Sequence, residues 1–220
     1  MIQLENVRRI FKVGEQTVAA LNGVSLSVEP GEYVSVMGPS GSGKSTLLNI
    51  IALLDQPTSG HYVLNGQDVT RQNDNELAKI RRDNIGFVFQ FFHLIPRLTA
   101  AENIEMPMVL AGMDKKIRQQ KVLKALSEVN LLDRADHKPN QLSGGQLQRI
   151  AIARAMIMQP GILLADEPTG NLDSKSGQEI VDLLEKLNQK GVTLIVITHD
   201  QNIGLRAGRK IKIIDGAIAV

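Results

Sequence analysis

A glycine- and serine-rich loop between an apolar strand and a helix constrains this sequence more than any other feature. The loop follows the apolar run 33–37 and consists of Gly38, Pro39, Ser40, Gly41, Ser42, Gly43, Lys44 and Ser45. Glycines let successive backbone N–H groups converge on phosphate oxygens without Cβ clashes, and a helix that begins near Lys44 adds unpaired donors and the positive end of its dipole. A simple glycine–serine turn is the alternative, but the flanking strand and helix are those that a phosphate-binding loop requires.

A pair of acidic residues, Asp166 and Glu167, ends the apolar strand 162–165. In a nucleotide hydrolase with such a phosphate loop, the first carboxylate holds Mg²⁺, usually through water, and the second accepts a proton from the attacking water. Lys44 would then reach the β- and γ-phosphates, and the Ser45 hydroxyl would ligate the metal. Solvated carboxylates that merely finish a strand are the alternative, and the loop upstream favours the catalytic interpretation.

Strands alternate with helices on both sides of a long helical stretch. We expect strands at 2–13, 18–28, 33–37, 61–64, 85–89, 162–166, 193–198 and 210–214, and helices at 44–54, 74–83, 102–111, 115–129, 144–157, 174–189 and 200–206. Alternation predicts a parallel α/β sheet, and the first two strands, joined at Gly14, are expected to be antiparallel. The helical stretch 101–158 is expected to be an insertion into that sheet.

Composition excludes several classes of protein. The chain has no cysteine, which rules out disulfides, thiol catalysis and cysteine-ligated zinc. Its longest nearly apolar stretch, 47–54, is far shorter than the ~18 residues that a membrane span needs. The net charge is +2, with lysine and arginine scattered among the acidic residues, so no nucleic acid is expected as a partner.

The segment 142–146, Leu-Ser-Gly-Gly-Gln, resembles the signature sequence of ATP-binding cassette (ABC) proteins. Further family landmarks follow in the expected order: Gln90 resembles the Q-loop glutamine, the segment 171–173 the D-loop, and His199 the switch histidine. The resemblance covers about residues 2–218. It implies an α/β fold with a P-loop NTPase (RecA-like) parallel-sheet core, an antiparallel β subdomain and an inserted α-helical subdomain. We expect one domain, 1–220, with the core and β subdomain at about 1–90 and 159–220 and the helical subdomain at about 91–158.

The resemblance also assigns roles to residues. Glu167 and His199 would be catalytic, Phe11 would stack on adenine, and Gln90 would join Ser45 and Asp166 as an Mg²⁺ ligand. Ser143 and Gly145 would meet the γ-phosphate of ATP held by the opposite subunit. The expected residues around ATP are Phe11, Gly38, Pro39, Ser40, Gly41, Ser42, Gly43, Lys44, Ser45, Thr46, Gln90, Ser143, Gly144, Gly145, Gln146 and Asp173. Leu147 departs from the pattern, because relatives often carry glutamine there.

Several segments are similar to one branch of the family, the MacB/LolD type, which contains macrolide-exporter and lipoprotein-releasing ATP-binding subunits. They are Gly38 to Thr46, Arg81-Arg82, Ile85 to Gln90, Leu98 to Asn103 and Leu164 to Ser174. This similarity implies an ATP-dependent head-to-tail homodimer and an integral membrane partner of the mechanotransmission kind. The chain would be cytoplasmic and peripheral on the inner face of the cell membrane, and would serve export or extraction of a substrate.

A regulatory or scaffolding ABC ATPase, whose dimerisation controls a membrane partner without transport, is an open alternative. Cassette ATPases of chromosomes or translation are disfavoured, because they need a coiled-coil insertion, a second cassette or an iron–sulfur domain. Phe87 and Phe89 alternate in a strand and are expected in the core. Phe91 and Phe92 lie where relatives dock a membrane partner, although core packing is an equal alternative for each. His61, His93 and His137 are expected at the surface or in turns.

Overall fold

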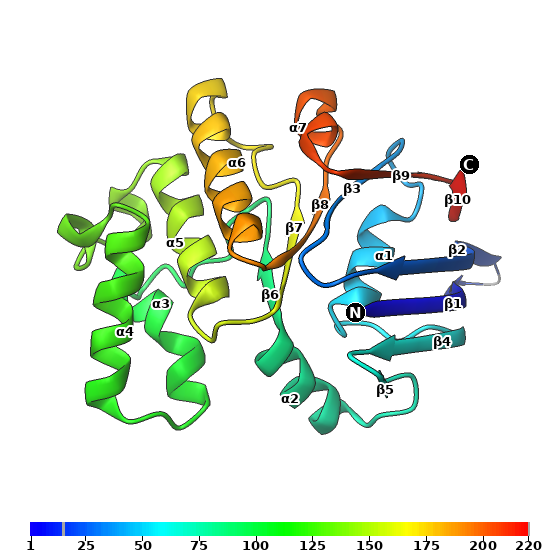
Figure 1. Ribbon diagram of the computed structural model, residues 1–220, viewed down its shortest axis with the longest axis horizontal. Coiled ribbons are helices and arrows are strands. Elements are labelled where there is room, and N and C mark those ends of the chain that lie inside the picture. Colours follow the sequence, from blue (N-terminus) through cyan, green and yellow to red (C-terminus); the bar gives the residue numbers. More distant parts are fainter. Residues whose placement is uncertain (15, 220) are drawn as a thin grey trace.

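The computed structural model describes residues 1–14 and 16–219 and arranges them around two β-sheets (Figure 1). The antiparallel sheet has the order β2-β1-β4-β5 and consists of β1 (Ile2–Val13), β2 (Gln16–Val28), β4 (Ser59–Leu64) and β5 (Gln67–Asp68). The second sheet has the order β10-β9-β3-β8-β7-β6 and consists of β3 (Tyr33–Met37), β6 (Ile85–Val88), β7 (Ile162–Asp166), β8 (Thr193–Ile197), β9 (Arg209–Ile214) and β10 (Ala217–Ala219).

Strands β9, β3, β8, β7 and β6 are parallel, and only β10 among the described strands of this sheet is antiparallel to its neighbour. The carboxyl ends of parallel strands meet at one edge of a sheet, where open α/β folds bind their ligands. The segments that follow Met37, Val88, Asp166 and Ile197 therefore leave the sheet at the same edge. All four segments carry expected site residues.

The helices are α1 (Lys44–Ile51), α2 (Asp74–Asn84), α3 (Ala100–Leu110), α4 (Lys115–Glu128), α5 (Gly144–Met156), α6 (Ser174–Gln189) and α7 (Gln201–Arg206), with 3₁₀ turns at Leu132–Arg134 and Pro139–Gln141. Helix α1 lies between the two sheets, and α6 and α7 cover the opposite face of the parallel sheet (Figure 1). Strand β7 shows why both faces are covered. Its Ile162 and Leu164 pack with α1 and the antiparallel sheet, whereas Leu163 and Ala165 pack with α6 and α7.

Helices α3, α4 and α5 form a separate apolar cluster on one side of the sheet (Figure 1). Its fully buried side chains include Ile104, Met108, Leu126 and Ile150. Helix α5 contacts α3 and α4 within this cluster and also α6 on the sheet. Helix α5 therefore connects the helical bundle with the core, and Leu183 of α6 also packs against the bundle.

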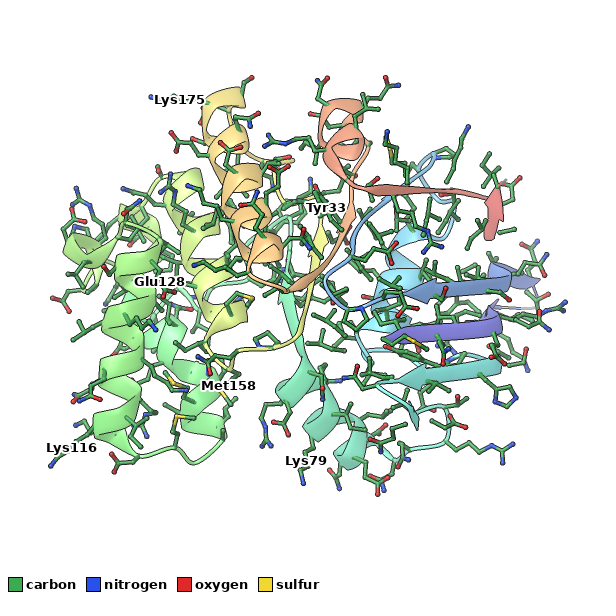
Figure 2. All side chains as sticks on the ribbon, viewed as in Figure 1. Tyr33, Lys79, Lys116, Glu128, Met158 and Lys175 are labelled. Atoms are coloured by element: carbon green, nitrogen blue, oxygen red, sulfur yellow. The ribbon has the colours of Figure 1, made fainter. Side chains whose placement is uncertain are left out.

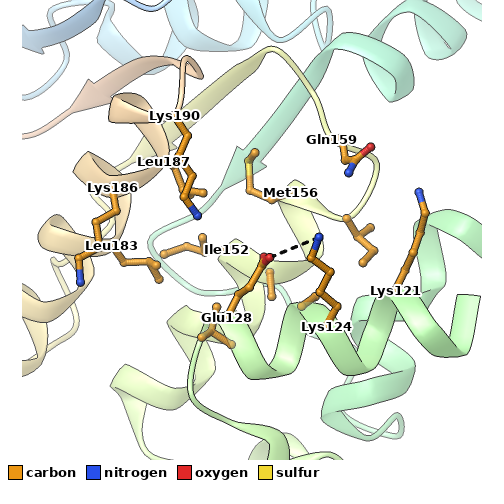
Figure 3. Close-up of a pocket in the computed structure, with 14 residues that line it drawn as sticks. Lys121, Lys124, Glu128, Ile152, Met156, Gln159, Leu183, Lys186, Leu187 and Lys190 are labelled. Carbon is orange, nitrogen blue, oxygen red and sulfur yellow. Dashed lines mark ion pairs between the residues drawn. The ribbon is translucent and has the colours of Figure 1, made fainter.

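A cavity of about 180 Å³ lies between α4, α5 and α6, where the bundle meets the core (Figure 3). Its lining includes the apolar Ile152, Met156, Leu183 and Leu187, and Lys124 and Glu128 form an ion pair of 3.9 Å in it. Other charged side chains, such as Lys79, Lys116 and Lys175, point away from the molecule (Figure 2). The packing between bundle and core is thus incomplete along this side of α5.

The structure corrects several expected boundaries. Helix α1 ends at Ile51 rather than 54, α3 begins at Ala100 rather than 102, and α5 ends at Met156 rather than 157. Strand β4 begins at Ser59 rather than 61, β9 begins at Arg209 rather than 210, and the strands expected to reach 89 and 198 end one residue earlier. Strands β5 and β10 were not expected, because they are too short to show a periodic pattern.

The expectation that Phe87 and Phe89 are core residues was confirmed in part, because Phe87 packs against the main apolar core whereas Phe89 belongs to none of the described apolar clusters. Both side chains are half-buried, and their rings stack on each other with centroids 4.2 Å apart. The β6 positions that are fully buried are Ile85, Gly86 and Val88. Gly86 lets α5 pack closely on this strand, because a Cβ there would lie 2.7 Å from the Ala155 carbonyl oxygen.

The expected single domain, 1–220, includes residues 15 and 220, which lie outside the described residues. Its division at 91 and 158 remains a prediction. In the described part of the chain, no helix is both long and apolar enough to span a bilayer.

Candidate active site

The phosphate loop between β3 and α1 has a shape that only glycine permits at two positions. Gly38 has φ of 152° and Gly43 has φ of 102°. A Cβ would lie 2.1 Å from the Ile213 carbonyl oxygen at Gly38 and 2.2 Å from the Ala20 carbonyl oxygen at Gly43. The loop is therefore pressed between β9 and β2, with its tip residues Pro39, Ser40 and Gly41 exposed to solvent.

Two polar side chains inside this loop, Lys44 and Ser42, are placed where they can bind an anion. The Lys44 ammonium donates to the carbonyl oxygens of Gly38 and Pro39 at 2.9 and 2.7 Å, which holds it within the loop. The Ser42 side chain is 3% exposed, and its hydroxyl has no hydrogen-bond partner among the described residues. Buried hydroxyls are normally paired, so this group fits a loop that receives phosphate oxygens.

Ser45 and Asp166 lie together at the first turn of α1, and Thr46 follows half-buried. Burial raises the pKa of Asp166, as does the nearby Glu167 carboxylate, whereas a hydrogen bond from Ser45 and the charge of Lys44 lower it. Such a carboxylate favours a bound cation. A hydroxyl and a carboxylate are oxygen donors of the kind that Mg²⁺ prefers, so the residues present fit the expected metal. Gln90, the third expected ligand, lies against Gly170, where a Cβ would be 2.8 Å from its amide nitrogen.

Glu167 directly contacts His199. The Glu167 Oε1 atom lies 2.9 Å from His199 Nδ1, and the backbone N–H of His199 donates to Oε2 at 3.4 Å. The hydrogen bond and charge of Glu167 raise the pKa of His199 above its ordinary value. Glu167 has φ of 46°, a conformation that is strained for any residue with a side chain. The two expected catalytic residues are therefore together at the carboxyl edge of the sheet.

The signature segment forms the N-terminus of α5. Ser143 is the N-cap residue: its hydroxyl accepts from the Gln146 N–H, and the Gln146 side chain accepts from the Ser143 N–H, which makes a capping box. Ser143 is exposed, as a residue that meets another molecule must be. A Cβ at Gly144 would lie 3.1 Å from Leu172, and one at Gly145 would lie 3.1 Å from Ser176. Both glycines thus also allow α5 to approach the start of α6.

Asp173 and Phe11 lie on other elements. Asp173 is the N-cap of α6 and accepts from the N–H groups of Lys175 and Ser176, which lower its pKa. Phe11 is on β1 and is 37% exposed, with the Arg9 guanidinium 4.6 Å from its ring centroid. This contact was not predicted, although residues two apart on a strand lie on the same face.

Three side chains that hold the segment after β6 were not predicted. Asn171 donates to the Gln90 carbonyl at 2.9 Å, Arg154 to the carbonyls of Phe92 and His93 at 2.9 and 2.6 Å, and Gln148 to that of Phe89 at 3.4 Å. The sequence placed Asn171 in the D-loop segment 171–173 without this contact, and the signal for Gln148 and Arg154 was weak, because they are only polar residues within the helix pattern 144–157.

The structure brings the phosphate loop, Asp166, Glu167 and His199 to one place and leaves the signature segment elsewhere. In Figure 1, β7 and β8 separate α5 from α1. Lys44 and Ser143 therefore belong to different parts of one chain.

Comparison with known proteins identifies the family to which a chain with this nucleotide site belongs. The profile of the ABC transporter family matches residues 21–170. The chain belongs to the ABC transporter family. It is 50% identical to an uncharacterised ABC transporter ATP-binding protein of Bacillus subtilis, over 99% of this chain and 95% of that protein. It is also 49% identical to the macrolide export ATP-binding/permease protein MacB of Burkholderia pseudomallei, over 99% of this chain but 33% of that protein.

A solved structure is equally similar. The ABC cassette MJ0796 of Methanocaldococcus jannaschii, in a dimeric post-hydrolysis state bound to ADP and phosphate, matches with a TM-score of 0.93 and 49% identity, covering 100% of this chain and 97% of that chain. These findings confirm the P-loop NTPase fold class and the resemblance to the MacB/LolD branch. The chain is an ATPase that uses ATP.

Proposed function

We propose that this chain is the ATP-hydrolysing subunit of a MacB/LolD-type transporter and drives export or extraction of a substrate through a membrane partner. The observation that carries the hydrolytic part is the contact of Glu167 with His199 beside Asp166 and the phosphate loop. A carboxylate there can take a proton from water, and an adjacent imidazole can hold the carboxylate and contact a terminal phosphate.

The chain's own residues have distinct roles in this proposal. The phosphate-loop N–H groups and Lys44 bind the phosphates, and Ser45, Gln90 and Asp166 hold Mg²⁺, which when bound neutralises phosphate charge. Glu167 accepts the proton of the attacking water. Phe11 stacks on adenine through its accessible ring, and Ser40, Gly41 and Thr46 complete the phosphate cradle.

A second copy of the chain completes the site. Ser143 is exposed at the N-terminus of α5, which offers donors to an anion, yet the central strands lie between α5 and α1, the helix that begins at Lys44. In a head-to-tail dimer with two-fold symmetry, Ser143, Gly144, Gly145 and Gln146 of one chain meet ATP held by the other. The dimeric state of the similar M. jannaschii cassette supports this arrangement.

The membrane partner is proposed to dock on a groove of about 600 Å³ between α2, α3 and α5. Among the residues that line it are Arg82, Ile95, Met106, Pro107, Leu110 and Arg154. Leu110 is 77% exposed. Phe91 is 67% exposed, so it is not a core residue. Arg154 connects this groove to the Phe92 and His93 carbonyls, next to Gln90. A partner of the mechanotransmission kind would keep the chain cytoplasmic, at the inner face of the membrane.

The hydrolytic proposal is tested with Glu167→Gln. This change preserves shape but removes the base, so hydrolysis should fall by roughly 10²–10⁴-fold while ATP still binds. ATP should then hold the closed dimer, seen as a doubled mass by light scattering with ATP but not with ADP. Hydrolysis at the parent rate would remove Glu167 as the base.

The docking proposal is tested with Leu110→Asp and a matched control, Val18→Asp, which changes an apolar residue of β2 that is 51% exposed. An integral membrane protein should co-purify with the parent and with Val18→Asp but not with Leu110→Asp. Equal recovery with all three would place the docking surface elsewhere. Substrate-stimulated ATPase activity in the assembled complex would distinguish transport from a purely regulatory role.

A further inference from the structure

Gln148 is a polar side chain in the middle of an apolar helix face. It lies on α5, and its exposed fraction is 0%, as is that of its neighbour Ile150. Its Nε2 group donates to the Pro168 carbonyl at 2.7 Å and to the Phe89 carbonyl at 3.4 Å. Its Oε1 atom is buried and has no hydrogen-bond partner among the described residues. Burying an unpaired acceptor is costly, so the amide must contribute something that an apolar residue would not.

The Pro168 and Phe89 carbonyls show what the Gln148 amide contributes. Both are acceptors only, so the side chain that reaches them must be a donor, and the amide of glutamine supplies two N–H groups at one nitrogen. A leucine or methionine would fill the same space but would leave the Pro168 carbonyl without this donor, whereas the Phe89 carbonyl would keep the Phe92 N–H at 3.3 Å. The geometry therefore requires a donor of this length at this position.

Each carbonyl belongs to a residue next to a proposed active-site residue. Pro168 directly follows Glu167. Glu167 has φ of 46°, and a proline at the next position further restricts its backbone conformation. Strained residues of this kind persist only where the surrounding contacts fix them. The Glu167 N–H is fixed by the Ile197 carbonyl at 2.9 Å. Gln148 fixes the following residue, Pro168. Phe89, the second partner of Gln148, immediately precedes Gln90.

We propose, on the basis of the function proposed above, that Gln148 is a positioning residue for ATP hydrolysis. It links the signature helix to the backbone beside Glu167 and to the backbone beside Gln90. It does not touch the reacting atoms. A movement of α5 when Ser143 meets the nucleotide of the other chain would thus be transmitted through one side chain to both loops.

Arg154 and Asn171 do not duplicate this link. Arg154 reaches only the carbonyls of Phe92 and His93, and Asn171 reaches only that of Gln90. Asn171 lies in the segment after β7 and so joins that segment to the segment after β6 without α5, whereas Gln148 alone among these three side chains joins α5 to both segments. Loss of Gln148 should therefore displace Glu167 while the rest of the Q-loop stays attached.

The test compares Gln148→Met with Ile150→Val in the full-length chain. Gln148→Met keeps the length of the side chain and removes the donor, and we expect kcat to fall at least 10-fold with KM for ATP within 2-fold of the parent. Ile150→Val also perturbs a fully buried position of α5 and should lower thermal stability without changing kcat. Parent kcat in Gln148→Met, or an equal loss of kcat in Ile150→Val, would overturn the proposal.

A second readout reports on Glu167 directly. Displacement of Glu167 should weaken its contact with His199, so the His199 pKa measured by NMR should move toward 6.5 in Gln148→Met. If that variant does not fold, Gln148→Asn, which keeps an amide that is too short to reach both carbonyls, takes its place with the same measurements. An unchanged His199 titration in the folded variant would contradict the proposal. Glu167→Gln belongs in the same assay, since parent activity there would refute the base assignment and not the role of Gln148.

Discussion

At the scale of single residues, the two side chains of the Glu167–His199 contact differ in their exposure to solvent. The Glu167 side chain is 17% exposed and that of His199 is 75% exposed. The carboxylate is thus held by the protein, whereas the imidazole reaches it from solvent. An imidazole in this position can leave the carboxylate when a phosphate competes for it, which suits a residue that is expected to respond to the γ-phosphate.

This contact predicts a titration. His199 has a raised pKa because Glu167 bonds and attracts its protonated form. The contact therefore stabilises the fold fully below the ordinary pKa of 6.5, and that stabilisation is lost as the pH rises through the raised pKa. NMR titration of the nucleotide-free protein should give His199 a pKa above 6.5, and Glu167→Gln should return it toward that value.

Phe11 predicts a change in nucleotide affinity. If its ring stacks on adenine, Phe11→Ala should weaken binding of both ATP and ADP by roughly 1–3 kcal/mol, the range for stacking of bases on aromatic side chains. The affinities for ATP and ADP should fall by the same factor, because the two nucleotides share the adenine base. Calorimetric titration measures both affinities, with Phe91→Ala as an exposed phenylalanine control. Unchanged binding would mean that Phe11 only packs under Arg9.

At the scale of elements, the two capping boxes of the helical bundle allow structure and function to be separated. Thr99 caps α3 and accepts from the Glu102 N–H at 3.2 Å, whereas Ser143 caps α5 in the same way through Gln146 at 3.4 Å. Both boxes satisfy N–H groups that a helix leaves unpaired in its first turn. Only the cap of α5 is expected to meet a nucleotide.

Replacing each cap with alanine gives a matched pair of variants. Thr99→Ala and Ser143→Ala should each lower the free energy of unfolding by about 1 kcal/mol, measured by denaturant titration. In the Glu167→Gln background, only Ser143→Ala should also weaken the ATP-dependent dimer. Equal weakening by both variants would show that dimerisation depends on bundle stability rather than on a contact of Ser143.

At the scale of the whole molecule, the separation of α1 from α5 supports the proposal that the active site is shared between two chains. Central strands lie between α1, which begins at Lys44, and α5, which begins at Gly144 (Figure 1), so we expect that one nucleotide does not touch both Lys44 and Ser143 of a single chain. Each chain would therefore contribute a phosphate loop to one site and a signature segment to the other.

Mixing two inactive variants tests this arrangement. Lys44→Ala removes the phosphate contact and Ser143→Arg blocks the signature contact, so neither variant alone should occlude labelled ATP. In a mixed dimer, one site carries both lesions and the other carries none, so occlusion should return up to about one site per mixed dimer. If mixed dimers form and occlusion does not return, the shared-site arrangement is wrong.

The sequence by itself determined the local chemistry of this protein. The spacing of Gly38, Gly43 and Lys44, the acidic pair after an apolar strand and the signature segment are short-range patterns, so the phosphate loop, the fold class and the family followed from them. The capping box of Ser143 and Gln146 is equally local. Such features are readable because the interacting groups lie within a few residues of one another.

Only the tertiary structure decided what holds these groups in place. The Glu167–His199 contact joins residues 32 apart, and the Gln148–Phe89 bond joins residues 59 apart. The short strand β10 was missed, although the turn before it supports the phosphate loop, with the Gly216 N–H donating to the Ser42 carbonyl at 3.0 Å. Periodicity reports whether a side chain faces the core, but not which backbone carbonyl it meets there, because that depends on how distant elements pack.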